Sequence, residues 1–229
     1  MARKGSKRRG CLWATARIGL AVVAGYFVAC ALLLVAYRWV EPPATTVQLQ
    51  RLIEAAVANE PVDLQYRPVP QAGQDDDIRH AVVASEDARF YTHGGFDRVE
   101  LERAWAERTA TGSMRGGSTI TQQLVKNLFL TTHRSVVRKA AEVPLTLLAE
   151  LILPKERILT LYLDVAEWGP GVFGIEAAAN HHYGTSAAAL SREQAARLAA
   201  VLPAPRERRP QDMARTSGRI LTRMRQMGW

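Results

Sequence analysis

The stretch "IRHAVVASEDARFYTHGGFD", residues 78–97, begins with the spacing of an α-helix. Four apolar or small residues lie three or four positions apart and so share one helical face: Ile78, Ala81, Val82 and Ser85. Three aspartates come just before them, where acids favour a helix N-terminus. The helix then meets two adjacent acids, Glu86 and Asp87, followed by an aromatic pair, His93 and a Gly-Gly turn.

The helical pattern continues through most of the chain that follows. It predicts a helix around residues 99–105, a helix from an N-cap at Ser118 to residue 127, and a long helix that ends at residue 153. Further helices are predicted at 156–164, 175–184, 191–202 and 220–227. Residues 167–174, "EWGPGVFG", have the composition of a turn, and no alternation is long enough to predict a sheet. The sequence therefore predicts one mainly α-helical domain.

A different segment lies near the N-terminus. Residues 18–37, "IGLAVVAGYFVACALLLVAY", carry no charge and have about the length that crosses a bilayer. A signal-peptide core is usually shorter, and this run stops at Arg38-Trp39, a charged and aromatic boundary. We interpret residues 18–38 as a retained transmembrane helix, with a buried helix of a soluble protein as the alternative.

Charge orients that helix. The first 17 residues form a basic tail without an acid and with six cations, which places the N-terminus in the cytoplasm: Arg3, Lys4, Lys7, Arg8, Arg9 and Arg17. This tail accounts for most of the net charge of +8 and leaves about +2 for the rest, so nucleic acid is not indicated as a partner. The exported part has no cysteine, because the two cysteines are Cys11 and Cys30.

A linker and juxtamembrane segment, residues 39–77, connects the helix to the domain at 78–229. It contains prolines that interrupt regular structure, but five apolar residues recur at helical spacing: Leu49, Leu52, Ile53, Ala56 and Val57. This short helix could face the membrane or pack on the domain, and the spacing is consistent with both.

Three clusters in the domain could carry chemistry. Adjacent acids such as Glu86 and Asp87 are mostly solvated, but the apolar flank, His93 and the glycine turn indicate a carboxylate at a cleft, acting as acid or base. His93 could also simply hydrogen-bond the turn. The supporting residues of this cluster are Asp87, Phe90, His93 and Gly94.

The second cluster is "GGSTITQQLVKNLFL", residues 116–130. Hydroxyls, amides and a cation crowd one short helix and could line a groove for a polyhydroxylated ligand: Ser118, Thr119, Thr121, Gln122, Gln123, Lys126 and Asn127. An exposed polar face or a strand is the alternative. Gly116 and Gly117 would permit close backbone approach or a hinge.

The third cluster is "HRSVVRKAAE", residues 133–142. Arg138 and Glu142 are four residues apart and share a helical face, which could be a surface ion pair of little consequence. Together with Lys126, however, the cations Arg134, Arg138 and Lys139 would suit a diphosphate.

These motifs together resemble the peptidoglycan glycosyltransferases. "EDARFYTHGGFD", "GGSTITQQLVKNLFL", "RKAAE", "KERILTLYLDVAEWGPGVFGIEAAA" and "LSREQAARLAAVLPAP" occur in the order of that family, from about Ile78 to Pro205. No penicillin-binding domain follows, so the chain is most similar to monofunctional members. The resemblance implies a lysozyme-like α fold and polymerisation of lipid II by inverting transfer, with undecaprenyl diphosphate as leaving group.

The resemblance also implies roles for single residues. Glu86 matches the general base and Glu142 a second essential acid near the diphosphate or a divalent ion. Lys126 and Arg134, with Arg138 and Lys139 nearby, match the cations at the leaving group, and Ser118, Gln122 and Gln123 match the sugar-binding wall. Mg²⁺ or Mn²⁺ is the implied cofactor, and no organic one is expected. The implied partners are lipid II, the growing glycan strand, the membrane, and other cell-wall synthesis or division proteins.

Three positions depart from the family pattern: Asp164 stands for the usual asparagine, Pro144 follows Glu142 closely, and "NHHYG" replaces a more aromatic ending. Pro144 could kink the helix that carries Glu142. Adjacent His181 and His182 suggest a metal site, but neighbours on a helix point apart, so surface or cleft-edge positions are expected.

Two other functions are compatible with one glutamate in a sugar groove. A lysozyme-type enzyme would cleave peptidoglycan, although the cations Lys126, Arg134 and Arg138 have no use in cleaving a neutral glycan. A membrane-tethered scaffold for cell-wall machinery would need no catalysis, and the presence of both Glu86 and Glu142 argues against it.

Overall fold

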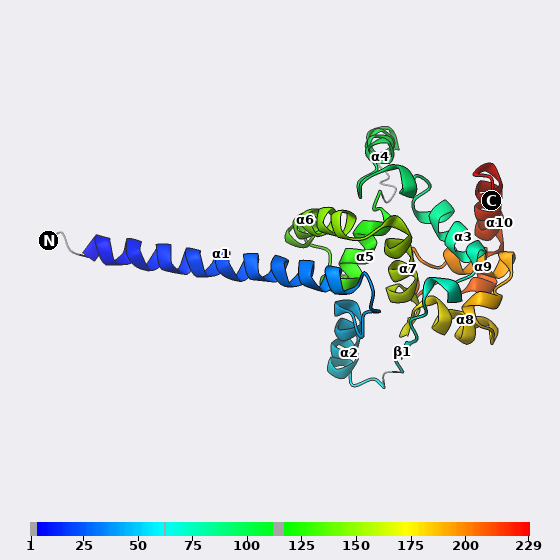
Figure 1. Ribbon diagram of the computed structural model, residues 1–229, viewed down its shortest axis with the longest axis horizontal. Coiled ribbons are helices and arrows are strands. Elements are labelled where there is room, and N and C mark those ends of the chain that lie inside the picture. The colour runs from blue at the N-terminus through cyan, green and yellow to red at the C-terminus, as the bar shows by residue number, and fades with distance from the viewer. Residues whose placement is uncertain (1–3, 62, 112–116) are drawn as a thin grey trace.

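A computed structural model describes residues 4–61, 63–111 and 117–229, and its longest helix, α1 (Lys4–Ala36), extends away from the rest of the chain (Figure 1). In the described part, its segment Thr15–Ala36 is the one helix long and apolar enough to cross a membrane. The last turns pack on the domain: Cys30 and Leu34 are buried, and the Tyr26 hydroxyl donates to the carbonyl of Phe129 at 2.7 Å.

The domain is built mainly of helices, as the sequence predicts. They are α2 (Thr46–Ala58), α3 (Asp76–Glu86), α4 (Arg98–Thr111), α5 (Ile120–Phe129), α6 (Val136–Ile152), α7 (Lys155–Val165), α8 (Ile175–Tyr183), α9 (Arg192–Ala199) and α10 (Ala214–Gln226). Short 3₁₀ turns lie between them: η1 (Gln71–Gly73), η2 (Phe90–Thr92), η3 (Ala187–Ala189) and η4 (Pro210–Met213).

The core forms around α5 and α7. Helix α5 packs against α6, α7 and α2, while α3 packs against α9 and α10. Apolar side chains without solvent exposure fill the space between these helices: Ile78, Leu124, Val125, Ile158, Leu161 and Trp168. The ends of α3 and α5 therefore lie on a rigid framework.

A small three-stranded sheet was not predicted. Its order is β1 (Gln65–Tyr66), β3 (Val172–Phe173) and β2 (Glu167–Gly169), with β1 parallel and β2 antiparallel to β3. The "EWGPGVFG" stretch thus forms a hairpin that pairs with a segment more than 100 residues earlier. Strands of two or three residues are too short to produce a recognisable alternation.

The helix ends correct several predicted boundaries. Thr119, and not Ser118, is the N-cap of α5: its hydroxyl accepts from the backbone N–H of Gln122, and the Gln122 side chain accepts from the backbone N–H of Thr119. The predicted capping box of Ser191 is confirmed, but α9 ends at Ala199 rather than at residue 202. Helix α10 begins at Ala214, well before the predicted residue 220.

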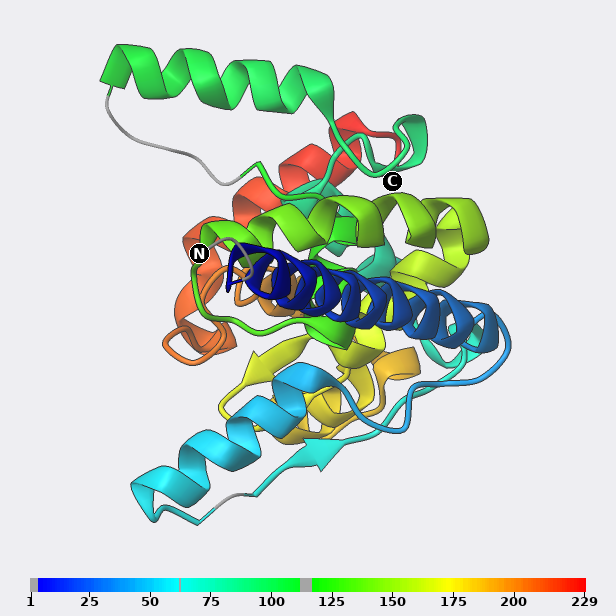
Figure 2. The same cartoon turned by 90° about the vertical axis from the view of Figure 1, so that its left-hand side faces the viewer.

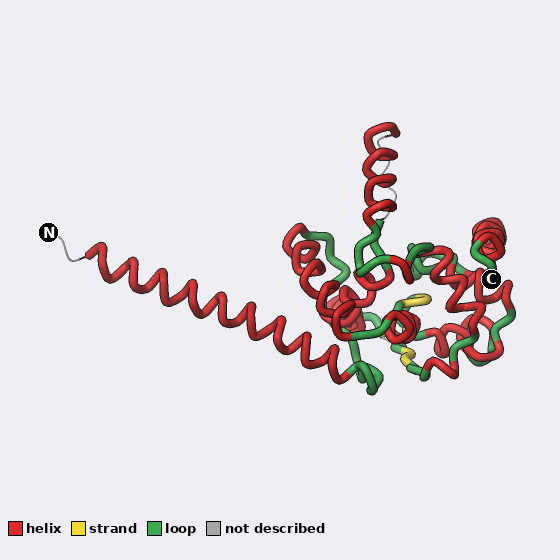
Figure 3. The backbone as a smooth tube through the Cα atoms, turned by 45° about the horizontal axis from the view of Figure 1, so that its top comes forward, coloured by secondary structure: helices red, strands yellow, loops and turns green. Residues whose placement is uncertain are grey.

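Helices α2 and α4 are unusual in what they expose. In α2 the polar residues Gln48 and Gln50 are buried, and four apolar ones face outward: Leu49, Leu52, Ile53 and Val57. Helices α2 and α6 flank α1 at the end of the domain from which α1 extends (Figures 1 and 2). Helix α4 projects from the domain (Figure 3) and exposes Trp105.

Candidate active site

Glu86 is the last residue of α3 and lies where this helix meets α5. Its Oε2 accepts a hydrogen bond of 2.9 Å from the Gln123 amide. Burial raises the pKa of Glu86, although the contact with Gln123 and the charges of Lys126 and Arg208 partly oppose the rise. A carboxyl with a raised pKa beside a cleft is suited to exchange protons near neutral pH.

Gln123 is itself held by a residue that the sequence analysis did not select. The Tyr162 hydroxyl of α7 donates to the other end of the amide, Oε1, at 2.9 Å. Because Oε1 is the acceptor, the amide nitrogen must point at Glu86. Tyr162 is almost fully buried, so this orientation is set by the core.

Asp87 and His93 connect three segments of the chain, and Asp87 also lines a cavity beside Glu86. The backbone of Gly95 donates to His93 Nδ1 at 3.1 Å, so Nε2 carries the proton and donates to Asp87 at 2.9 Å. The second oxygen of Asp87 accepts from the backbone of Ile120 at the start of α5, at 3.1 Å. The two residues thus join the end of α3 to the turn and to α5.

The glycine that this turn requires is Gly95, whereas the sequence analysis selected Gly94. Gly95 has a φ of 88° and a Cβ there would lie 2.6 Å from the Thr146 side chain. A Cβ on Gly94 would meet nothing within 4 Å. Phe90 is fully buried beneath the turn, with the Lys155 ammonium over its ring at 4.4 Å.

Glu142 lies buried on α6 between two cations. Arg138 donates to one carboxylate oxygen, and the Lys139 ammonium lies 2.7 Å from the other. Burial lowers the pKa of Lys126 on α5, while the negative charges of Glu142 and Glu86 partly oppose this change. Lys126 forms no ion pair with any described residue, which leaves its charge available to a bound anion.

The other predicted binding residues are placed differently. Ser118 is exposed and accepts from Lys139 at 3.4 Å, whereas Thr119 and Gln122 are buried in the cap of α5. Asn127 is also buried and accepts through its backbone from Thr46 of α2. Arg134 is exposed in the loop before α6, and Gly116 lies outside the described residues.

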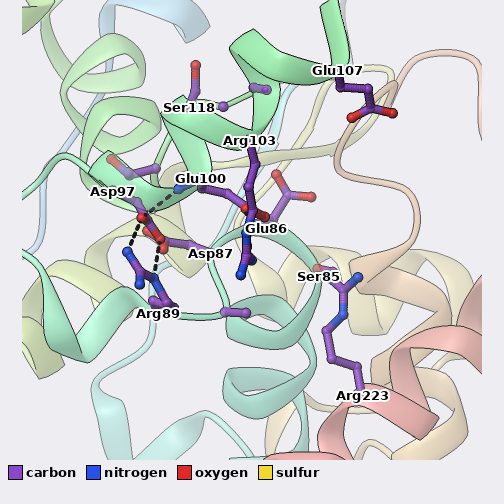
Figure 4. Close-up of a pocket in the computed structure, with 14 residues that line it drawn as sticks. Ser85, Glu86, Asp87, Arg89, Asp97, Glu100, Arg103, Glu107, Ser118 and Arg223 are labelled. Carbon is purple, nitrogen blue, oxygen red and sulfur yellow. Dashed lines mark hydrogen bonds and ion pairs between the residues drawn. The ribbon is translucent and has the colours of Figure 1, made fainter. Parts of the chain in front are cut away.

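Two cavities meet at Glu86. The larger, about 410 Å³, lies between α3, α4 and the start of α5, and its acids outnumber its cations (Figure 4): Glu86, Asp87, Asp97, Glu100 and Glu107 against Arg89, Arg103 and Arg223. The smaller, about 180 Å³, lies between α3, α9 and α10 and is also lined by Ser85, Glu86 and Arg223. One carboxyl can therefore face ligands on two sides.

Glu142 and the group Asp87, His93 and Asp97 do not fit a resident divalent cation, because the atoms that could bind it already have partners. Both oxygens of Glu142 accept from cations, so a metal there would have to displace Arg138 or Lys139. Asp87, His93 and Asp97 lie close enough to share an ion, but the first two bond each other and Asp97 accepts from Arg89.

Asp164, which departs from the family pattern, is fully buried on α7. Its Oδ1 accepts from the backbone of Val69 and from Gln74, both at 3.2 Å. Its Oδ2 is buried without a hydrogen-bond partner, as is one oxygen of Glu41. Burial raises the pKa of Asp164 to about 8, so at neutral pH it resembles a neutral asparagine.

Asp164→Asn is expected to stabilise the protein in alkaline solution. Because the folded-state pKa is raised, the stability contributed by Asp164 is lost as the pH rises from about 4, the value of an ordinary aspartate, to about 8. Above pH 8 the variant should gain at least about 1 kcal/mol, or about 2–4 °C in Tm. Thermal unfolding at pH 5 and 9 tests this, and a difference independent of pH would contradict it.

The remaining expectations concern α6 and α8. Helix α6 runs from Val136 to Ile152 and continues through Pro144. Arg138 and Glu142 therefore lie on the same helix as the buried residues Leu145 and Ala149. His181 is exposed, and His182 donates to the carbonyl of Trp168 at 3.0 Å, as expected for surface and edge residues rather than a metal pair.

Sequence reasoning missed the basic residues beside the smaller cavity. Arg208, Arg219 and Arg223 line it, the last two from α10. The last 24 residues contain seven arginines and two acids, which would have shown this region to be basic. Averaged over the whole chain outside the tail, their charge is masked by the acids elsewhere.

Comparisons with known proteins agree with the geometry. The sequence model of the family described as Transglycosylase matches residues 52–227. The biosynthetic peptidoglycan transglycosylase of Pseudomonas putida (strain W619) is 49% identical over 181 residues, which are 79% of this chain and 77% of that protein. The protein of the same name from Pseudomonas savastanoi pv. phaseolicola is 46% identical over 201 residues, or 86% and 85% of the two chains.

Proposed function

Since the chain belongs to the transglycosylase family, we propose that it polymerises lipid II into β-1,4-linked glycan strands, with Glu86 as the general base. The observation that carries this proposal is the position of Glu86, a carboxyl of raised pKa at the junction of two cavities. A polymerase needs room for two sugars, the donor and the acceptor, one on each side of the base.

In the proposed step, the 4-hydroxyl of the acceptor's N-acetylglucosamine attacks the anomeric carbon of the donor's N-acetylmuramic acid. A new C–O bond forms with inversion as the bond to the diphosphate oxygen breaks. Glu86 takes the hydroxyl proton, and undecaprenyl diphosphate leaves with the electron pair. The ionised form of Glu86 is therefore the active one.

Lys126, Arg138 and Lys139 are proposed to stabilise the departing diphosphate, with exposed Arg134 at the edge. The buried ammonium of Lys126 supports this role, because a charge in a partly desolvated site interacts more strongly than one in water. Glu142 would hold Arg138 and Lys139 in place through its two ion pairs. Ser118 and Gln123 are the proposed cleft contacts, since Gln122 and Asn127 are buried. Thr119 is buried in the cap of α5 but also lines the larger cavity.

A divalent cation, Mg²⁺ or Mn²⁺, is proposed to bind through the diphosphate oxygens of the substrate. Mg²⁺ is commonly held by substrate phosphates with few protein ligands. This arrangement is consistent with Glu142 being enclosed by cations. Its contribution would be neutralisation of the leaving group.

The proposed location is the bacterial inner membrane, with a single span and the catalytic domain in the periplasm. The apolar helix Thr15–Ala36 is consistent with an anchor. Helix α2, which exposes several apolar residues, lies at the same end of the domain (Figure 1). The proposed division is a cytoplasmic tail at 1–17, a span at 18–38, a juxtamembrane segment at 39–77 and the catalytic domain at 78–229. Other cell-wall synthesis or division proteins remain proposed partners.

Tyr162→Phe is expected to shift the acidic limb of the pH–rate profile to higher pH. Without the hydroxyl, the Gln123 amide loses its fixed orientation and with it the hydrogen bond that lowers the pKa of Glu86. Turnover near neutral pH should fall about fivefold, the effect of one hydrogen bond. An unshifted profile with reduced stability would show that Tyr162 supports only the fold.

Incubation of the full chain with lipid II tests the proposed function. The expected products are β-1,4-linked strands and undecaprenyl diphosphate, and a chelator separates a cation requirement from polymerisation itself. Shortening of preformed glycan would instead indicate the lysozyme-type reaction, and the absence of both activities would indicate a scaffold.

A further inference from the structure

The smaller cavity at Glu86 differs in charge from the larger one. Glu86 is the one acid in its lining. The lining also contains three arginines, which are Arg208, Arg219 and Arg223. The larger cavity has more acids than cations. An anionic part of a ligand bound at Glu86 is therefore attracted to the side of α9 and α10.

The three arginines are not equally occupied by the protein. Arg208 donates to the carbonyl of Ala200 at 2.9 Å, and Arg223 to the carbonyl of Ala84 at 2.8 Å. Arg219, one turn before Arg223 on α10, makes no hydrogen bond or ion pair with a described residue. Its five donors are open to a carboxylate, which a guanidinium can bind through two parallel contacts.

This cation cluster lies at the far end of the domain from α1 (Figure 1). The diphosphate of a membrane-held lipid is matched instead by Lys126, Arg138 and Lys139 on α5 and α6, beside α1. The remaining anions of the proposed substrate are the carboxylates of its peptide stem. Figure 4 shows Arg223 directed from α10 toward Ser85, the neighbour of Glu86.

We propose that Arg219, with Arg223 and Arg208 beside it, binds a carboxylate of the peptide stem carried by the muramyl sugar. This inference rests on the proposed function and extends it, because the site would distinguish substrates by their peptide. The stem could belong to the incoming lipid II or to the growing strand, and both present the same carboxylate chemistry.

Direct binding tests the inference without polymerisation. The probe is a soluble disaccharide-pentapeptide, titrated calorimetrically into the full chain, and its Kd should rise about 3- to 10-fold in Arg219→Gln. Amidation of the peptide carboxylates should abolish the difference between parent and variant. Arg225→Gln is the matched control, since this arginine lies on the same helix but does not line the cavity.

Kinetics then identify the source of the stem. If the incoming lipid II supplies it, Arg219→Gln raises KM already in the first coupling; if the growing strand supplies it, the strands become shorter while the first coupling is unchanged. Equal Kd values for parent and variant, or the same loss with the amidated probe, would overturn the inference. Failure of the parent to polymerise lipid II would instead contradict the proposed function.

Discussion

Glu86→Gln is expected to lower glycan polymerisation by about 10²- to 10⁴-fold, the usual contribution of a positioned proton acceptor. Glutamine has nearly the same shape and can keep a contact with Gln123, but it cannot take the acceptor's proton. The measurement is formation of glycan strands from lipid II at saturating substrate. In the parent, the acidic limb of kcat/KM should lie above that of an ordinary glutamate, because burial raises the pKa.

The stability of Glu86→Gln, measured against pH, distinguishes the loss of the base from misfolding. The folded-state pKa of Glu86 is raised, so its stabilising contribution is present at low pH and is lost as the pH rises through that pKa. Glu86→Gln should therefore become more stable than the parent as the pH rises. A variant that still polymerises at the parental rate, or that unfolds earlier in alkaline solution, would contradict the assignment of Glu86.

Lys126→Ala has the second largest expected effect, a fall in kcat of about 10²- to 10³-fold. The ammonium is desolvated and has no ion-pair partner among the described residues, so its charge acts mainly on the departing diphosphate. KM should change less than kcat if the interaction strengthens as the leaving group gains charge. Single-turnover measurements with lipid II distinguish the two parameters.

Two further substitutions serve as controls for Lys126. Lys126→Arg retains the charge and should recover part of the activity. Arg134→Ala removes an exposed cation whose charge is screened by water, so its loss should be about tenfold or less. Equal effects of Lys126→Ala and Arg134→Ala would show that burial does not distinguish them. A lowered unfolding temperature of Lys126→Ala would indicate a structural role.

Much of the fold follows from local sequence. The apolar spacing at 78–85, the acids before it and the capping pattern at Ser191 each predict a helix that the structure contains. The apolar run near the N-terminus likewise predicts α1. These features depend on neighbours within one or two turns, which a sequence displays directly. The three-stranded sheet depends on pairing between distant residues and was missed.

The candidate site divides in the same way. Its chemical groups were recognised from residue type and motif, but sequence position does not show which of them face a cleft. Thr119 and Gln122 lie within a polar motif and turn out to cap α5, while Tyr162 lies in an apolar helix and orients Gln123. Burial and hydrogen bonding decide these roles, and both arise only when the helices pack.

By itself, the sequence determined the helical composition of the domain, the apolar N-terminal helix and the acids and cations available for the reaction. Tertiary structure alone decided that Glu86 lies between two cavities, that Gly95 is the constrained glycine and that Arg219 lines the smaller cavity. The physical reason is the distance along the chain between the groups that interact. Helix formation depends on contacts a few residues apart, whereas the pKa of Glu86 and the charge of each cavity depend on groups from α3, α5, α9 and α10.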